Sequence, residues 1–177
     1  ATWSPVVLPG VTDWSEFHFA YYLDRTTVTA DRVQAGTFYI YYVGGPASGV
    51  YKSTNGGSSW TKVFSGEISP FSAYNAKIEA VPGKAGHLFF TAGPVEGGVN
   101  PAAQGFFHST DGGATWTALP NVKEVATFGY GAPATWGGYS AIYIVGWVNN
   151  VYGVWQSDNE GATWKQIGDW PTGNLDQ

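Results

Sequence analysis

The feature that most constrains this chain is an eight-residue motif that occurs three times, at residues 53–60, 109–116 and 157–164. Its common form is S-x-[DN]-x-G-x-[ST]-W. The octets begin at residues 53, 109 and 157, so the periods are 56 and 48 residues. Such periods are near the length of the four-stranded blades of a β-propeller, about 40–50 residues, and are longer than those of most helical solenoids. The spacing therefore predicts an all-β repeat fold.

Each octet has the chemistry of a hairpin turn between two short strands. Serine and Asp or Asn side chains bond nearby backbone amides, glycine at the fifth position tolerates positive φ, and the tryptophan anchors the exit strand. We assign this structural role to Ser53, Asn55, Gly57, Trp60, Ser109, Asp111, Gly113, Trp116, Ser157, Asn159, Gly161 and Trp164.

A second recurring element is an apolar strand, at residues 37–42, 87–92 and 141–146, preceded by a shorter strand at 25–33, 76–81 and 122–128. Nearly continuous apolar runs predict strands that are covered on both faces, as inner strands of stacked blades would be. Together with the octet hairpin, each repeat has four strands. Four strands per repeat make a propeller blade.

The tryptophans that end the octets extend the repeat to the start of the chain. Trp3 precedes Trp60 by 57 residues, and Trp60, Trp116 and Trp164 follow at similar intervals. We expect residues 1–177 to be one partial propeller domain, of about three four-stranded blades plus the outer strand of a fourth, excised from a longer chain. An open propeller segment leaves edges exposed, so we expect self-association or cover by the remaining blades.

Composition excludes several function classes. Eight Lys and Arg against thirteen Asp and Glu give a net charge of −5, so no nucleic-acid partner is expected. No apolar stretch approaches the ~18 residues that span a bilayer, so no membrane partner is expected either. Cysteine is absent. We read the three histidines, His18, His87 and His108, as lying on different repeats without a metal-ligand spacing, and predict no metal site and no cofactor.

The octets resemble those of the Asp-box, or bacterial neuraminidase repeat, propellers. A closer likeness comes from segments 29–33, 79–88 and 153–158, which are similar to late blades of the second propeller in family 74 glycoside hydrolases, the xyloglucanases. That resemblance implies two seven-bladed propellers flanking a cleft, and inverting hydrolysis of the β-1,4-glucan backbone of xyloglucan by one Asp from each propeller. The family's catalytic motifs lie on earlier blades and have no match here, so no catalytic residue is carried over.

Carboxylates are the residues to test for glycosidase chemistry, because inversion needs two carboxyl groups about 6.5–9.5 Å apart across one cleft. The candidates are Asp13, Glu16 and Asp24, which flank an aromatic segment, with Glu67 and Glu96 in two other loops. Most such carboxylates are simply solvated. We expect Asp31 and Arg32 to form an ion pair within a blade or to anchor a turn. A sialidase would need a cluster of arginines, and the chain holds only Arg25 and Arg32.

Aromatic side chains in long loops are the other functional signal. Such loops leave the blades at residues 11–23, 66–75, 93–104 and 127–139. Loops on a rigid scaffold carry binding sites, and flat aromatic faces suit sugar rings, although packing between blades is the competing role. The predicted sugar-stacking residues are Trp14, Tyr22 and Trp136.

The sequence therefore predicts a carbohydrate-active propeller segment of a secreted or periplasmic, xyloglucanase-type enzyme. It would supply cleft wall and stacking surface to a polysaccharide, without a complete catalytic pair of its own. The alternative is a noncatalytic propeller for protein binding or assembly, which fold alone does not exclude. A stable fragment without activity is compatible with both.

Overall fold

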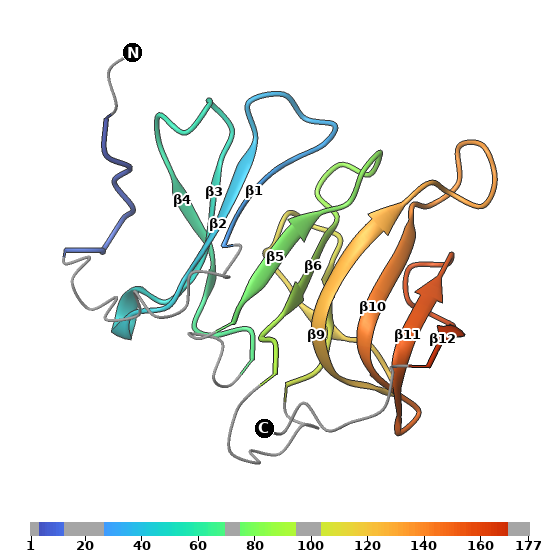
Figure 1. Ribbon diagram of the computed structural model, residues 1–177. Coiled ribbons are helices and arrows are strands. Elements are labelled where there is room, and N and C mark those ends of the chain that lie inside the picture. Colours follow the sequence, from blue (N-terminus) through green and yellow to red (C-terminus); the bar gives the residue numbers. More distant parts are fainter. Residues whose placement is uncertain (1–3, 13–26, 70–74, 95–103, 170–177) are drawn as a thin grey trace.

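The computed structural model describes residues 4–12, 27–69, 75–94 and 104–169, and in these residues the chain is all-β apart from one 3₁₀ turn, η1 (Gly45–Ala47). Twelve strands form three four-stranded antiparallel sheets that stand side by side (Figure 1). Within each sheet the strands follow chain order, so each sheet is a simple meander. The predicted propeller segment of four-stranded blades is confirmed. None of the described residues form a helix long and apolar enough to cross a membrane.

Each sheet is one blade. Blade 1 contains β1 (Val28–Ala30), β2 (Phe38–Tyr42), β3 (Gly49–Ser53) and β4 (Thr61–Ser65). Blade 2 contains β5 (Lys77–Ala80), β6 (Leu88–Thr91), β7 (Phe107–Ser109) and β8 (Thr117–Ala118). Blade 3 contains β9 (Val122–Gly131), β10 (Ala141–Val148), β11 (Val151–Ser157) and β12 (Lys165–Gly168).

The apolar runs form the second strand of each blade, as predicted. Strand β6 is buried along its whole length, and β2 and β10 are largely buried. Each of these strands is hydrogen-bonded on both edges, and its apolar side chains fill the space on both faces of the sheet. The octets connect the third strand to the fourth, where the sequence placed the hairpins.

Two hydrophobic layers join the blades. The layer between blades 1 and 2 is built around Tyr39, Tyr41, Val50, Ile78, Leu88 and Phe90. The layer between blades 2 and 3 is built around Phe89, Phe106, Val125, Phe128, Ile142 and Ile144. Polar contacts also cross them: the Ala80 N–H donates to the Thr29 hydroxyl at 3.1 Å, and the Thr91 hydroxyl donates to the Val125 carbonyl at 2.7 Å.

The meander sorts the loops onto two ends of the molecule. The connections between first and second strands lie beside the octets, at what we call the octet end, toward the top of Figure 1. Backbone bonds join them there, since the Gly56 N–H donates to the Gly36 carbonyl and the Gly112 N–H to the Gly86 carbonyl, both at 2.9 Å. Connections between second and third strands, and between blades, lie at the opposite end. From the sequence alone, the four aromatic loops are one set, and none of them is assigned to either end of the molecule.

Candidate functional site

The serine and Asp or Asn side chains of the octets form their hydrogen bonds within their own turns. In the second octet, the Ser109 hydroxyl accepts from the Gly113 N–H at 2.9 Å and donates to the Asp111 carboxylate at 2.8 Å. Asp111 also accepts from the backbone of Ala114 and from the backbone and hydroxyl of Thr115. Partial burial opposes ionisation, but these hydrogen bonds outweigh it and lower the pKa of Asp111. A carboxylate held in this way is not available as a general acid.

The first and third octets share this pattern, with asparagine in place of aspartate. The Ser53 and Ser157 hydroxyls each accept from the fifth-position glycine N–H at 3.0 Å. The third octet departs in two ways. Glu160 stands where the others have glycine, and the Trp164 indole N–H is buried without a partner, whereas Trp60 and Trp116 donate to a glycine carbonyl.

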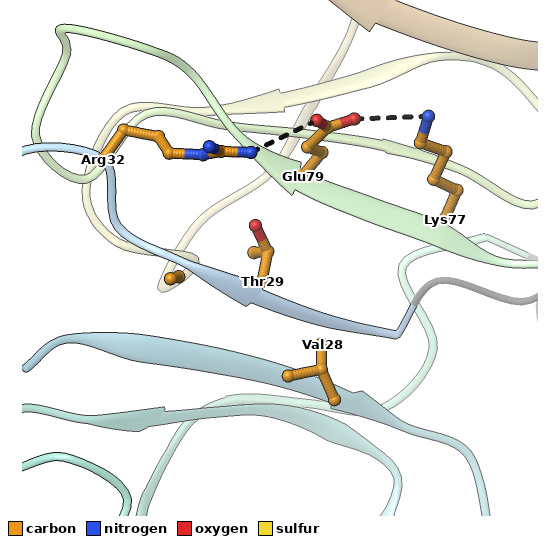
Figure 2. A pocket seen from close by; sticks show the side chains of 6 residues that line it. Val28, Thr29, Arg32, Lys77 and Glu79 are labelled. Atoms are coloured by element: carbon orange, nitrogen blue, oxygen red, sulfur yellow. Dashed lines mark ion pairs between the residues drawn. The ribbon is translucent and has the colours of Figure 1, made fainter.

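A groove of about 510 Å³ opens between the innermost strands of blades 1 and 2, β1 and β5. It is lined by Val28, Thr29, Ala30, Arg32, Lys77 and Glu79. Figure 2 shows the Glu79 carboxylate between two cations, with Arg32 Nη2 3.9 Å from Oε1 and Lys77 Nζ 3.2 Å from Oε2. Lys77 also donates to the Phe128 carbonyl of blade 3 and lies 4.6 Å from the centroid of the Phe128 ring.

The lining of this groove does not meet the requirement for inverting hydrolysis. Glu79 is the one acidic residue among the six that line the groove. Its carboxylate forms ion pairs with the Arg32 and Lys77 side chains. A second carboxyl group across a water is what the mechanism needs. Among the described residues, the groove is therefore a charged seam between blades and not a catalytic pair.

Of the two alternatives predicted for Asp31 and Arg32, the structure shows the turn anchor. Asp31 anchors its turn, because its carboxylate accepts from the N–H groups of Val33 at 2.8 Å and Gln34 at 2.7 Å. It also accepts from the Gly86 N–H of blade 2 at 2.8 Å. The predicted ion pair within a blade is wrong: Arg32 pairs with Glu79 of the next blade. Adjacent first strands bring the two side chains together across the seam.

Of the other predicted site residues, the structure describes Glu67 and Trp136. Asp13, Glu16, Asp24, Trp14 and Tyr22 lie outside the described residues, as does Glu96. Glu67 is exposed in the connection between blades 1 and 2, at the end opposite the octets. Trp136 is fully exposed in the β9–β10 connection, and therefore at the octet end.

A cluster that the sequence analysis missed lies at the octet end, between blades 2 and 3. We call it the histidine cluster: His87, His108, Tyr139 and Glu160. The Tyr139 hydroxyl lies 3.2 Å from His87 Nδ1 and 3.3 Å from His108 Nε2. The ligand atoms of His87, His108 and Glu160 all lie within 4.8 Å of one another.

This arrangement corrects the prediction that His87 and His108 lie on different repeats, whereas His18 lies outside the described residues. His87 directly precedes β6, and His108 lies on β7, the neighbouring strand of the same blade. Tyr139 comes from the β9–β10 connection, and Glu160 from the third octet. Aligning the octets by register would have shown the signal, because Glu160 replaces a glycine of the repeat.

Burial tunes the histidine cluster. The His108 ring stacks on Phe89, with ring centroids 4.2 Å apart and planes at 9°. Desolvation, and then the nearby His87, lower the pKa of His108 to about 4. Desolvation, and then the Glu160 carboxylate, raise the pKa of the Tyr139 hydroxyl. At neutral pH the His108 imidazole is therefore neutral, with a lone pair available.

Comparisons with known proteins agree with the fold. A xyloglucanase of a Paenibacillus species is 37% identical over 145 residues, which cover 82% of this chain and 13% of that protein. The xyloglucanase Xgh74A of Acetivibrio thermocellus is 40% identical over 142 residues, which cover 80% of this chain and 15% of that protein. This chain thus spans less than a sixth of each of these relatives. No protein-family model matches the chain.

Solved structures give the same result. The GH74 enzyme of Niastella koreensis superposes with a TM-score of 0.60 at 31% identity, over 80% of this chain and 19% of that one. An ancestral GH74 enzyme superposes with a TM-score of 0.51 at 22% identity, over 80% of this chain and 18% of that one, and supports the fold alone. The sequence relatives described above are xyloglucanases, and both solved structures are GH74 enzymes.

Proposed function

We propose that this chain is a propeller segment of a xyloglucan-hydrolysing enzyme of the GH74 type. The observation that carries the proposal is the identity of 37% and 40% to two xyloglucanases over about four fifths of the chain. Fold alone would not identify a substrate, because one fold hosts many functions. The fold does explain the segment's contribution, which is a rigid stack of blades that presents loops at two ends.

The segment's role in this proposal is to bind the polysaccharide and form cleft wall, while catalysis belongs to the whole enzyme. The chain corresponds to 13% and 15% of the length of the two relatives. Asp13, Glu16 and Asp24 stay candidates for a contribution to catalysis. A polymer of this size is met outside the cell, so the proposal includes secretion or a periplasmic location.

Sugar stacking is proposed at Trp14, Tyr22 and Trp136. Trp14 and Tyr22 lie outside the described residues, and their part of the proposal rests on the sequence. Trp136 presents its whole indole at the octet end. The contribution of each residue is therefore tested separately.

Native gels cast with and without xyloglucan test the proposal directly. We expect xyloglucan to retard the chain selectively, relative to cellulose-derived and unrelated polysaccharides. Ala substitutions at Trp14, Tyr22 and Trp136 should each reduce the retardation if that residue stacks on sugar. Trp147→Ala is the control, because this tryptophan is 37% exposed but lies on strand β10 and not in a loop.

Equal mobility in all gels would contradict glycan binding by this segment and favour the alternative, a propeller surface for protein. Blade 3 offers one observation for that alternative: Trp147, Val151 and Ile167 are 37%, 45% and 45% exposed. Apolar exposure on the last described blade fits a further blade or a second copy of the chain. Sedimentation equilibrium over a range of concentrations would detect self-association.

A further inference from the structure

The histidine cluster holds three side chains, His87, His108 and Glu160, whose metal-ligand atoms lie close to one another. Two imidazole nitrogens, His87 Nδ1 and His108 Nε2, point at the same hydroxyl of Tyr139 from 3.2 and 3.3 Å. The Glu160 carboxylate reaches the same place, within 4.8 Å of both imidazoles. Ligand atoms of two imidazoles and one carboxylate therefore lie within 4.8 Å of one another between blades 2 and 3, with the Tyr139 hydroxyl beside both imidazoles.

The backbone at Glu160 gives an independent observation. Its φ is 61°, in the left-handed region that side chains with a Cβ disfavour. The same octet position holds Gly56 and Gly112, with φ of 73° and 74°. The third octet thus accepts strain that a glycine would remove, and the strained residue is the one that places a carboxylate beside two histidines. Strain that the fold does not require is a pointer to function.

The neighbouring blade interface shows that the repeat does not demand this cluster. By strand register, Lys52 of blade 1 corresponds to His108, because Tyr39 pairs with Lys52 as Phe89 pairs with His108. Residue 37, one before β2, corresponds to His87 and is a threonine. The octet residue that faces Lys52 is Gly112. The three ligand types therefore occur together at the interface between blades 2 and 3, and not at the one between blades 1 and 2.

We propose that His87, His108 and Glu160 bind one divalent transition-metal ion, Zn²⁺ by preference, which joins blade 2 to blade 3. Two imidazoles and a carboxylate are a zinc ligand set, and leave a fourth position for water or the Tyr139 hydroxyl. Ligand atoms around a tetrahedral zinc lie about 3.3 Å apart, given bond lengths of about 2.0–2.1 Å. The Glu160 side chain is exposed, so its carboxylate has room to move toward the ion by rotation about its own bonds.

The proposed role of the ion is structural. His87 and His108 belong to blade 2, whereas Glu160 belongs to blade 3, so the ion would add a bond across the apolar layer between them. Phe89 stacks on one ligand and shields it from solvent. In the metal-free chain the Tyr139 hydroxyl bridges the two imidazoles, and holds them near the geometry that the ion requires.

Zinc titration of the tag-free, chelator-treated chain tests the proposal by calorimetry and by thermal unfolding. We expect one ion per chain, and a rise in Tm of about 5–10 °C at a free zinc concentration of about 100 times Kd. Cobalt substitution should give the intense visible absorption of a tetrahedral site. Absence of zinc binding, or binding without a rise in Tm, would overturn the proposal.

Two variants test whether the ion binds at this cluster. Each introduces a residue that stands at the equivalent position of another repeat. Glu160→Gly restores the octet glycine, so the metal-free variant should fold at least as well as the parent chain while losing the zinc response. His108→Gln introduces the residue that precedes the third octet, Gln156, and should also lose it. Tyr139→Phe should weaken binding by about 10–100-fold, as loss of a supporting group does.

Asp158→Asn is the matched control, because it removes one negative charge from the same turn outside the cluster. It should keep both the stoichiometry and the rise in Tm. Zinc binding that survives unchanged in Glu160→Gly and His108→Gln would place the ion elsewhere, and would refute this site. The result is independent of xyloglucan binding, since none of these measurements involves a polysaccharide.

Discussion

The two blade interfaces differ most at the octet end, although the same repeat builds both. Between blades 1 and 2, Lys52 lies 5.7 Å from the Tyr39 ring centroid, and the Tyr39 hydroxyl donates to Asp31 at 3.1 Å. Asp31 in turn accepts from Gly86 of blade 2. This interface is closed by charge and hydrogen bonds.

Between blades 2 and 3, the corresponding positions hold Phe89 and His108, stacked ring on ring. Tyr139 and Glu160 come from the next blade to face His108, with His87 beside it. The position of Lys52 is thus taken by His108, and the lysine described near this cluster, Lys84, lies 5.6 Å from the Tyr139 ring centroid. The comparison teaches that the repeat fixes the backbone of an interface and leaves its polar chemistry free to change.

The largest expected difference between the interfaces is in the unfolding free energy that is lost when a buried side chain of each apolar layer is truncated. Phe106 and Val50 are equivalent by strand register, two residues before His108 and Lys52, and both are fully buried. Phe106→Ala should lower the free energy of unfolding by about 3–5 kcal/mol, because the ring packs on Phe89, Phe128 and Trp164. Val50→Ala removes less surface and should cost about 2 kcal/mol.

Urea denaturation of both variants measures this difference. Equal losses would contradict the idea that the second layer depends on its aromatic cluster. A change in the slope of the transition would mean that the two blades no longer unfold together.

The glycine at the fifth position of the octet should be the next most sensitive to substitution by alanine. The loss of stability should be larger where the neighbouring blade packs against this glycine. Gly113 and Gly57 both have positive φ, of 84° and 86°, so alanine is strained at either by about 1–2 kcal/mol. A Cβ at Gly113 would also lie 3.0 Å from Val50 and 3.3 Å from Leu88, whereas at Gly57 its nearest neighbour is Trp60 at 3.7 Å.

Gly113→Ala should therefore cost about 2–4 kcal/mol and Gly57→Ala about 1–2 kcal/mol. Thermal unfolding of the pair gives the comparison. A larger loss in Gly57→Ala would show that backbone strain differs between octets in a way that blade contacts do not explain.

The fold could be predicted because each part of a blade has its own local signal. The octets marked the outer hairpins, and the apolar runs marked the second strands, so strand order followed from the repeat alone. The sorting of loops onto two ends could also have been deduced, since a four-stranded meander alternates direction. Without that step, Trp136 was grouped with loops of the opposite end.

The histidine cluster was harder to predict because its members meet through blade stacking. Tyr139 lies 52 residues from His87 in the chain, and the two touch because blade 3 packs on blade 2. A search for metal-ligand spacing along the sequence does not detect contacts of that kind. The departure of Glu160 from the repeat was the available signal, and it was visible only when the octets were aligned position by position.

The interfaces should also respond to acid over different pH ranges. Burial lowers the pKa of His108 to about 4 in the folded chain, below its ordinary value of 6.5. The unfolded chain therefore takes up this proton first, and the stability that the neutral imidazole supports is lost as the pH falls from about 6.5 to about 4. With metal chelated, the unfolding free energy of His108→Gln should vary less over this range than that of the parent chain.

Protonation of Asp31, at the interface between blades 1 and 2, should lower the stability of the fold only at a lower pH. Partial burial opposes its ionisation, but hydrogen bonds from Gln34, Gly86, Val33 and Tyr39 outweigh this and lower its pKa below 3.8. Its contribution is complete above that value and is lost below it. Asp31→Asn should therefore leave the loss between pH 6.5 and 4 unchanged. If it removes that loss, the assignment to His108 is wrong.

The smallest expected effect comes from the ion pair that links blades 1 and 2 at the inner groove. Arg32 and Glu79 are 3.9 Å apart, and the arginine side chain is 55% exposed, so Arg32→Gln should cost less than about 1 kcal/mol. Glu79 keeps its closer partner Lys77, at 3.2 Å, after this change. Salt at about 0.5 M should remove most of the difference, because screening acts within a few Å. A loss above about 2 kcal/mol that persists in salt would mean that Arg32 holds the seam through packing and not through charge, and that the two interfaces are more alike than their polar groups indicate.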